Sequence, residues 1–301
     1  MKVFTLCVLL LISVWILIYV SVFSCSTSVQ RTPTQKTPVT SVEKDFVYVC
    51  GLSKDLEKDK KMIKRIHSII KPDKIFVVTK KVSRNLPIPV IQIKEPQNLP
   101  KIRIDRIASL RNYCLKKIQN YNLYMKNKND WKNIKLIWVD LDMLIPDKTL
   151  KVVRSELTHN STYDVICANG RANFDDKFYY DVSATILNDG TFAYLTQWVL
   201  HPELNKHVTF TLINSVFPLE NNEKKYTPVK SCFGGLTIYK FPIQNCRYKL
   251  SNNLGDNFYD RYKYYDYGKV RICEHIPFNL CLLEKGATFA VNLDMKVFWT
   301  G

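Results

Sequence analysis

The sequence has no CxxC pair, no internal repeat and, after its amino terminus, no long apolar run. The missing CxxC pair argues against a structural zinc site, which usually takes two ligands from closely spaced cysteines. The chain also has no basic arm, zinc-finger spacing or RNA-binding aromatic signature, so we predict no nucleic-acid partner despite a net charge of +17. The basic residues are instead scattered among Asn, Ile and Tyr, which is typical of AT-rich coding sequence.

The one long apolar run lies at the amino terminus. Residues 3–23 carry no charge. A helix of this length, at about 1.5 Å per residue, can cross a hydrocarbon core about 30 Å thick. We favour an uncleaved signal anchor over residues 1–25, because a cleaved signal peptide has a shorter apolar core of roughly 7–15 residues. Cleavage near residues 24–26 is the alternative.

Residues 26–44 are rich in Ser, Thr and Pro and are predicted to form a stem. Residues 45–301 then form one folded domain, since no further linker interrupts them and 46% of the residues of the whole sequence are hydrophobic. This layout predicts a single-pass type II membrane protein with a lumenal domain in a Golgi- or ER-like compartment. A secreted protein, or a viral protein that works in host membranes, is the alternative. The sequence does not indicate the oligomeric state.

Seven of the nine cysteines lie beyond the predicted anchor. In an oxidising compartment we expect one or two disulfides among them, and our choice of pair is Cys246 with Cys273. The odd number leaves at least one free thiol, most simply a buried one. Asn160-Ser161-Thr162 is a glycosylation sequon for a chain that enters the secretory lumen.

Short apolar segments alternate with amphipathic ones over the first part of the folded region. This alternation predicts an α/β fold with a mixed, mostly parallel sheet that is flanked by helices on both faces. The expected strands are 45–52, 74–80, 88–94, 134–139 and 163–170, and the expected helices are 55–70, 101–121 and 147–159. After residue 171 the pattern loosens. Residues 230–240 predict a loop that leads into a strand, and the Asn-, Tyr- and Lys-rich stretches around them predict long loops.

One predicted core strand, residues 134–139, ends in two carboxylates, Asp140 and Asp142. Ligands of open α/β sheets bind outside the carboxyl ends of the strands, and side chains two residues apart on a strand share a face. We therefore predict that both carboxylates bind one divalent cation, which would bridge to a diphosphate. The alternative is a helix cap and turn, but it explains Asp147 better than Asp140.

Several longer blocks occur around this motif. They are "RIASLRNYCL", "IWVDLDMLIP", "YDVICANG" followed by "FYYDVSATILNDG", "VKSCFGGLTIYK" and "CEHIPFNLCLLEKGATFAVN". With them the chain resembles GT-A glycosyltransferases, and among these the fungal capsule-associated α-1,3-mannosyltransferase family, with a fainter likeness to Golgi mannan-polymerase mannosyltransferases. The resemblance covers most of residues 103–292.

The resemblance implies a GT-A, Rossmann-type fold and transfer of a hexose from a nucleotide sugar to a hydroxyl of a glycan acceptor. It further implies Mn²⁺ (or Mg²⁺) as cofactor and retention of the anomeric configuration. GDP-mannose is the leading donor, and a UDP-hexose is the alternative. In a retaining front-face mechanism the departing phosphate takes the acceptor proton, so no dedicated base is required.

Further candidate residues for binding the donor follow from side-chain chemistry. Arg106, Arg111 and Asn112 lie on one predicted helix and are placed to reach a phosphate or a sugar edge. An arginine on a solvated helix face is the alternative. Gly234 and Gly235 would let the backbone approach a ligand closely, unless they form an ordinary turn.

The acidic candidates extend beyond the two aspartates of the motif. Asp164, Asp181 and Glu274 are the predicted catalytic residues, with Asp164 and Asn169 bracketing a sugar-binding strand end. By the resemblance, His275 is the third metal ligand, although a lone histidine is more often structural. Asp189 belongs to an "NDG" segment, which is typical of a turn.

Two other functional classes remain open at this point. A metal-dependent nuclease or phosphotransferase would use the same two aspartates, but it leaves the apolar amino terminus and the later blocks unexplained. An inactive glycan-binding protein on the same fold would not need the intact D-x-D motif.

Overall fold

The computed structural model describes residues 45–83, 86, 88–124, 131–159, 161–171, 179, 181–190, 193, 224–249 and 273–299. The predicted anchor (1–25) and stem (26–44), the sequon residue Asn160 and most of the predicted long loops lie outside these residues. Within the described part, no helix combines the length and the apolar character that a membrane span requires.

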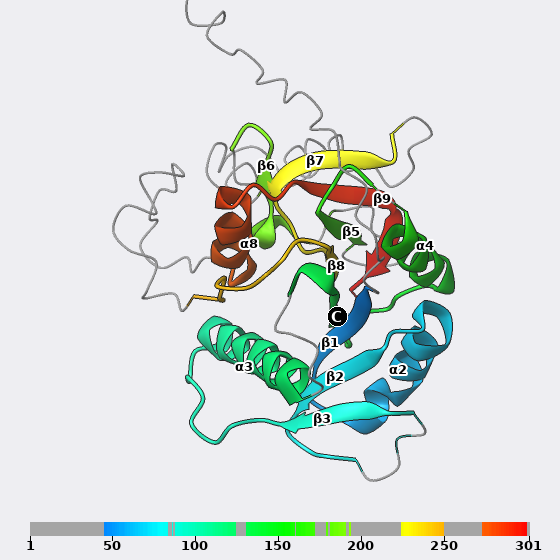
Figure 1. The fold of residues 1–301 in the computed structure, drawn as a ribbon, viewed down its shortest axis with the longest axis vertical. Helices are drawn as coiled ribbons and strands as arrows, with labels where there is room; N and C mark the ends of the chain where they lie inside the picture. The colour runs from blue at the N-terminus through cyan, green and yellow to red at the C-terminus, as the bar shows by residue number, and fades with distance from the viewer. Residues whose placement is uncertain are drawn as a thin grey trace, which may run out of the picture. The chain divides into compact units, whose positions relative to one another are not determined.

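The described strands form one nine-stranded sheet in the order β3-β2-β1-β4-β8-β5-β9-β7-β6 (Figure 1). The strands are β1 (Phe46–Ser53), β2 (Lys74–Thr79), β3 (Val90–Lys94), β4 (Ile134–Asp140), β5 (Val165–Arg171), β6 (Ile186–Leu187), β7 (Tyr226–Ser231), β8 (Leu236–Tyr239) and β9 (Phe289–Phe298). The helices are α2 (Leu56–Ile70), α3 (Arg103–Tyr124), α4 (Asp147–Thr158) and α8 (His275–Glu284), with short 3-10 helices at Trp131–Asn133 and Val182–Ala184.

Every strand and helix predicted before residue 171 is confirmed, with ends shifted by at most three residues. The sheet is mixed, as predicted. The pairs β1–β2, β2–β3, β1–β4 and β5–β9 are parallel. β8 is antiparallel to β4 and β5, and β7 is antiparallel to β9 and β6. Only β7 and β8 therefore run against the common direction of the described strands.

The strand order reverses beside β1. The chain adds β2 and β3 on one side of β1 and then returns to place β4 on its other side. In an open α/β sheet, the crevice outside the carboxyl ends of such a strand pair is the usual ligand-binding position. Asp140, the last residue of β4, lies in register with Leu52 near the end of β1.

The two faces of the sheet have different cores. Along β4, Leu136 and Trp138 point to the face that α3 and α8 cover, whereas Ile137 and Val139 point to the face that α2 and α4 cover (Figure 1). Adjacent residues face opposite ways because side chains alternate along a strand. The first core is rich in aromatic residues and contains the half-cystines, and we call it the aromatic face. The buried members of the second are Val, Ile, Leu, Met and Ala, and we call it the aliphatic face.

Three disulfides connect elements on the aromatic face, more than the one or two predicted. They are Cys50–Cys114, Cys167–Cys232 and Cys246–Cys281. The predicted pair Cys246–Cys273 is wrong. The loop after β8 packs on the middle of α8, where the Tyr248 ring stacks on Phe278 with centroids 4.3 Å apart, and Cys281 lies one turn further along that helix. Among the described cysteines Cys273 is the free thiol.

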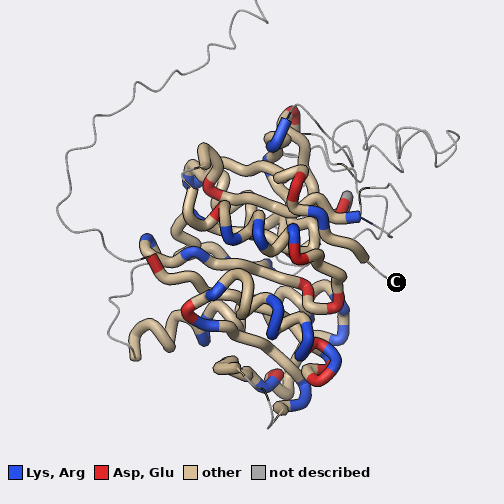
Figure 2. Tube along the Cα trace, turned by 90° about the vertical axis from the view of Figure 1, so that its right-hand side faces the viewer, with Lys and Arg blue, Asp and Glu red and all other residues tan. Residues whose placement is uncertain are grey.

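Charged residues of both signs are interspersed over the side of the molecule shown in Figure 2. The basic residues that are scattered in the sequence are thus also mixed with acidic residues in space on this side. The pattern after residue 171 did not predict α8 or β9, although β9 pairs with both β5 and β7 inside the sheet.

Candidate functional site

The D-x-D motif lies where β4 ends. The main-chain N–H of Asp140 donates to the Gly235 carbonyl at 2.9 Å, which ties the end of β4 to the turn before β8. Asp142 lies beyond the strand in a turn and is exposed, while its neighbours Leu141 and Met143 are buried in the aliphatic face. The rule that side chains two residues apart on a strand share a face therefore applies to Asp140 only. Asp142 is positioned by the turn after the strand.

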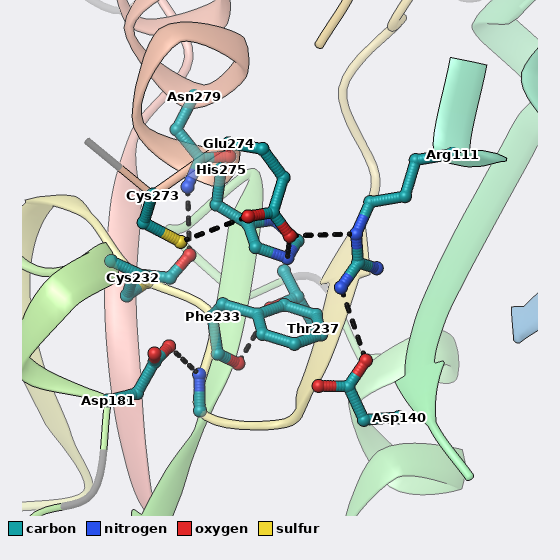
Figure 3. Close-up of polar contacts among 12 residues, drawn as sticks. Arg111, Asp140, Asp181, Cys232, Phe233, Thr237, Cys273, Glu274, His275 and Asn279 are labelled. Atoms are coloured by element: carbon teal, nitrogen blue, oxygen red, sulfur yellow. Dashed lines mark hydrogen bonds and ion pairs between the residues drawn. The ribbon is translucent and has the colours of Figure 1, made fainter. Parts of the chain in front are cut away.

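Arg111 bonds to the first of these aspartates from helix α3 (Figure 3). Its Nη2 lies 3.1 Å from Asp140 Oδ1, and its Nε lies 3.2 Å from Glu274 Oε1. The Arg111 side chain is only 3% exposed, whereas that of Asp140 is 26% exposed. Arg111 therefore lies beneath Asp140, on the side of the carboxylate away from solvent.

Aromatic rings surround the Arg111 guanidinium. Its central carbon lies 5.0 Å from the ring centroid of Trp138, 4.8 Å from that of Phe233 and 5.8 Å from that of Tyr248. These distances are in the range of cation–π attraction, which is stronger where water is excluded. Burial lowers the pKa of Arg111, but the charges of Asp140 and Glu274 outweigh this effect, so its pKa lies above the usual value and the group stays charged.

The Asp140 carboxylate has one oxygen on Arg111 and one oxygen with no hydrogen bond among the described residues. Burial raises the pKa of Asp140 to about 6, Arg111 opposes this shift, and the nearby charge of Asp142 adds to it. At neutral pH the group is thus ionised, with its Oδ2 available to a ligand. A cation there would relieve the repulsion between the two aspartates.

The glycines of "SCFGG" form a turn with a structural requirement for glycine. Gly234 has φ +66°, and a Cβ at this position would lie 2.0 Å from the Ala168 carbonyl oxygen. Gly235 has φ +78° and carries the carbonyl that binds Asp140. The turn packs on the backbone of β5. The contacts of Gly234 and Gly235 are therefore those of a tight turn, which was the alternative to a ligand-binding role.

Asp181 supports this turn and does not point at the D-x-D motif. Its Oδ2 accepts a hydrogen bond from the Gly234 N–H at 2.6 Å (Figure 3). Burial raises the pKa of Asp181 to about 7 against the effect of this bond, and the negative charges of Asp140 and Glu274 raise it further. Asp181 thus lies close to the site and acts on the loop that positions Asp140.

Glu274 and His275 reach the site from the start of α8. Glu274 is buried and accepts a weak hydrogen bond from the Cys273 thiol at 3.5 Å, in addition to the Arg111 contact. The His275 ring stacks on Phe233 with centroids 3.7 Å apart. Burial and the charge of Arg111 hold the pKa of His275 well below its usual value, so the ring is neutral. Neither of its nitrogens has a hydrogen-bond partner among the described residues.

The structure does not group His275 with the two aspartates. No cluster of three or more His, Cys, Asp or Glu side chains suited to a metal ion occurs among the described residues. In the part of the chain that the structure describes, the donor set on offer is the free Asp140 oxygen and the exposed Asp142 carboxylate. This set fits a hard divalent cation, because Mg²⁺ is usually held by one or two carboxylates together with waters and substrate phosphates.

Three other candidates lie apart from this group. Asp164 precedes β5, at the opposite end of a strand that spans about 20 Å, and its Oδ2 caps Thr288 through the main-chain N–H at 2.9 Å and the hydroxyl at 2.8 Å. Arg106 pairs with Glu95 at 3.0 Å, and both side chains are partly buried. Asp189 is exposed in the turn that Gly190 closes, as its "NDG" segment predicted.

Asn112 and Asn169 also have positions that differ from the predicted ligand contacts. The Asn112 amide donates to the Tyr248 carbonyl at 2.7 Å and accepts from the Tyr248 N–H at 2.9 Å. Asn112 therefore holds the main chain of Tyr248, whose ring lies beside Arg111. Its amide group is used for this contact and not for a ligand. Asn169 is fully buried in β5.

Sequence reasoning missed Asp59 and the aromatic residues around Arg111. Asp59 lies in the first turn of α2, where its Oδ2 accepts a hydrogen bond from Ser53 Oγ at 2.5 Å. Burial raises the pKa of Asp59, and the charge of Asp142 contributes to this shift, so the two carboxylates are neighbours. The position of α2 directly after β1 was the available signal, because the loop after β1 borders the point where the strand order reverses.

No protein-family model matches the chain, and no curated protein is similar to it. Among solved structures, one similar protein is a glycosyltransferase involved in the glycosylation of the major capsid of PBCV-1, with 9% identity, a TM-score of 0.26, and coverage of 41% of this chain and 52% of that chain. A second is GalNAc-T7 with UDP, GalNAc and Mn²⁺, with 11% identity, a TM-score of 0.38, and coverage of 86% and 44%.

A third is mouse xyloside xylosyltransferase 1, with 10% identity, a TM-score of 0.33, and coverage of 82% of this chain and 84% of that chain. This chain thus spans about half the length of the first two proteins. Because all three TM-scores are below 0.5, the function is argued below from the residues of the site.

Proposed function

We propose that the chain is a metal-dependent glycosyltransferase that moves a hexose from a nucleotide sugar to a hydroxyl of a glycan acceptor. The observation that carries the proposal is the position of Asp140 and Asp142 at the carboxyl end of β4, beside the strand-order reversal. This is the usual ligand position of an open α/β sheet. Both aspartates have carboxylate oxygens without a partner among the described residues.

A divalent cation at these carboxylates, Mn²⁺ or Mg²⁺, would neutralise charge on the departing nucleoside diphosphate. The chain's own contribution is to hold the Asp140 carboxylate ionised and oriented. With retention of configuration, the oxygen of the departing phosphate takes the proton of the acceptor hydroxyl. The preference for GDP-mannose over a UDP-hexose rests on the motif resemblance alone.

The compartment is part of the same proposal. Three disulfides around the site support folding in an oxidising lumen, since such bonds are rare in the cytosol. The apolar residues 3–23 would anchor the chain there as a type II membrane protein.

A donor screen tests the proposed activity. The full chain is incubated with Mn²⁺ and a panel of UDP- and GDP-sugars, and release of the nucleoside diphosphate is compared between wild type and Asp142→Ala. Metal-dependent turnover of one donor that is lost in the variant supports the proposal. Cleavage of a nucleic acid in parallel reactions would favour the nuclease alternative, and inactivity with every donor would favour an inactive glycan-binding protein.

A further inference from the structure

We propose that Arg111 is a positioning residue that holds the Asp140 carboxylate for a divalent cation, and not a ligand of the donor phosphate. The inference rests on the proposed function, because it concerns the same cation site. Its first support is burial. With 3% of its side chain exposed, Arg111 cannot present its guanidinium to a diphosphate in solution without leaving its present contacts.

The geometry around Arg111 fixes the direction of its hydrogen bonds. The guanidinium is flat, and the rings of Trp138, Phe233 and Tyr248 lie within 6 Å of its centre. A planar group enclosed in this way directs its N–H groups along fixed lines. One of these lines leads from Nη2 to Asp140, and another leads from Nε to Glu274.

Asp140 is consequently held at two points. Gly235 accepts from its main-chain N–H, and Arg111 donates to its Oδ1. The oxygen that remains is Oδ2, which Figure 3 shows pointing away from Arg111. Partners of this kind, which bind a metal ligand and not the metal, typically change metal affinity or activity 10- to 100-fold when they are removed.

Glu274 acts one step further from the cation. Its Oε1 accepts from Arg111 Nε, and the Cys273 thiol lies at its other oxygen. The buried carboxylate thus supplies the second contact that keeps the guanidinium in its plane between the rings. On this account Glu274 is also a positioning residue, and its hydrogen bond influences the orientation of Asp140 through Arg111.

The test is a titration of the full chain with Mn²⁺ in the presence of GDP, with a parallel titration in the presence of UDP. Binding is measured from the electron paramagnetic resonance signal of free Mn²⁺. Arg111→Lys keeps the positive charge but replaces the rigid planar fork, which donates to Asp140 and Glu274 from two nitrogens, by one rotatable ammonium that does not fix the direction of either bond. We expect about a tenfold or greater loss of Mn²⁺ affinity. The matched control is Arg106→Lys on the same helix. Arg106 pairs with Glu95 and not with the D-x-D motif, so we expect this variant to bind Mn²⁺ as wild type does.

A double variant separates positioning from loss of stability. Glu274→Gln alone should weaken Mn²⁺ binding, whereas in the Arg111→Lys background it should add little, because its effect passes through Arg111. A merely structural role would lower the melting temperature of each variant and leave Mn²⁺ affinity at the wild-type value.

The outcomes also distinguish this inference from the proposed function. If wild type binds Mn²⁺, Asp142→Ala does not, and Arg111→Lys binds as wild type does, the positioning role is overturned while the cation site stands. If wild type shows no Mn²⁺ binding with either nucleotide, both are overturned. Fully additive losses in the double variant would contradict the route from Glu274 through Arg111.

Discussion

The two faces of the sheet are packed by different residues. The aliphatic face under α2 and α4 is buried Val, Ile, Leu, Met and Ala, whereas the aromatic face under α3 and α8 combines aromatic rings with all three disulfides. Arg111, Glu274 and Asp140 meet on the aromatic side. Aliphatic packing stabilises the sheet and buries Leu141 and Met143 on either side of the exposed Asp142. The aromatic face additionally fixes a buried guanidinium, and through it one carboxylate of the D-x-D motif.

The largest effect is expected where the aromatic face meets the backbone of β5. Gly234→Ala would place a Cβ 2.0 Å from the Ala168 carbonyl oxygen in a backbone conformation that favours glycine. We expect a loss of more than about 4 kcal/mol of unfolding free energy together with loss of Mn²⁺ binding. Urea unfolding and Mn²⁺ titration measure the two effects.

Gly286→Ala is the matched control for this substitution. Gly286 also has a positive φ, +94°, but a Cβ there would meet nothing within 4 Å. Backbone strain alone should lower stability by about 1 kcal/mol. Equal losses for the two variants would contradict the close approach of the Gly234 turn to β5.

A cavity on the aliphatic face should separate stability from cation binding. Ile63 on α2 is fully buried there, and Ile63→Ala should lower the free energy of unfolding by about 2 to 5 kcal/mol. Mn²⁺ affinity of the folded protein should stay within about twofold of wild type, because Ile63 packs on the face of the sheet opposite the rings that hold Arg111. A loss of affinity as large as that of Asp142→Ala would erase the distinction between the two faces.

The pH dependence of stability should reflect Asp181. Its pKa, about 7 in the folded chain, lies above the usual value of 3.8, so the folded state binds this proton more tightly. The resulting stabilisation is complete below about pH 4 and is lost as pH rises through about 7. Asp181→Asn should therefore gain on the order of 2 kcal/mol relative to wild type between pH 5 and pH 8. If the unfolding free energies of the two proteins, measured in urea, changed in parallel between pH 5 and pH 8, the prediction would be wrong.

The smallest effect is expected at the far end of β5. Asp164→Ala removes the cap on Thr288 and should lower stability by about 1 kcal/mol. Asp164 precedes β5, whereas Asp140 lies at the carboxyl end of β4, so the two residues lie at opposite edges of the sheet. Turnover and Mn²⁺ affinity should therefore not change. A large loss of turnover without loss of stability would support the predicted catalytic role of Asp164.

Local patterns predicted most of the first half of the fold. The strands and helices from β1 to β5 each carry their own periodicity, so their positions follow from short windows of sequence. The insertion of β8 between β4 and β5, and the pairing of β9 with β5 and β7, depend on contacts between distant segments. The error over the Cys246 partner has the same cause, since the pairing depends on which face of α8 meets the loop after β8.

The site could be predicted where it depends on strand direction. Asp140 follows from the end of an apolar strand, whereas Asp142 lies beyond the strand in a turn that the two-residue spacing does not describe. Arg111 was identified as an important residue, but its burial and its contact with Asp140 depend on how α3 packs against β4. Asp59 itself is an ordinary aspartate in the first turn of a helix, so its one signal is the position of α2 directly after β1.

The central claim is that Asp140 and Asp142 hold a cation for sugar transfer, and Mn²⁺-dependent release of nucleoside diphosphate from the best donor tests it most directly. Wild type is compared with Asp142→Asn, and Asp189→Asn is the matched control because Asp189 is also exposed in a turn. The account predicts that Asp142→Asn lowers turnover about 100-fold or more, while Asp189→Asn and wild type are equal. Turnover that persists in Asp142→Asn, or that is unchanged when the metal is removed with EDTA, would contradict it.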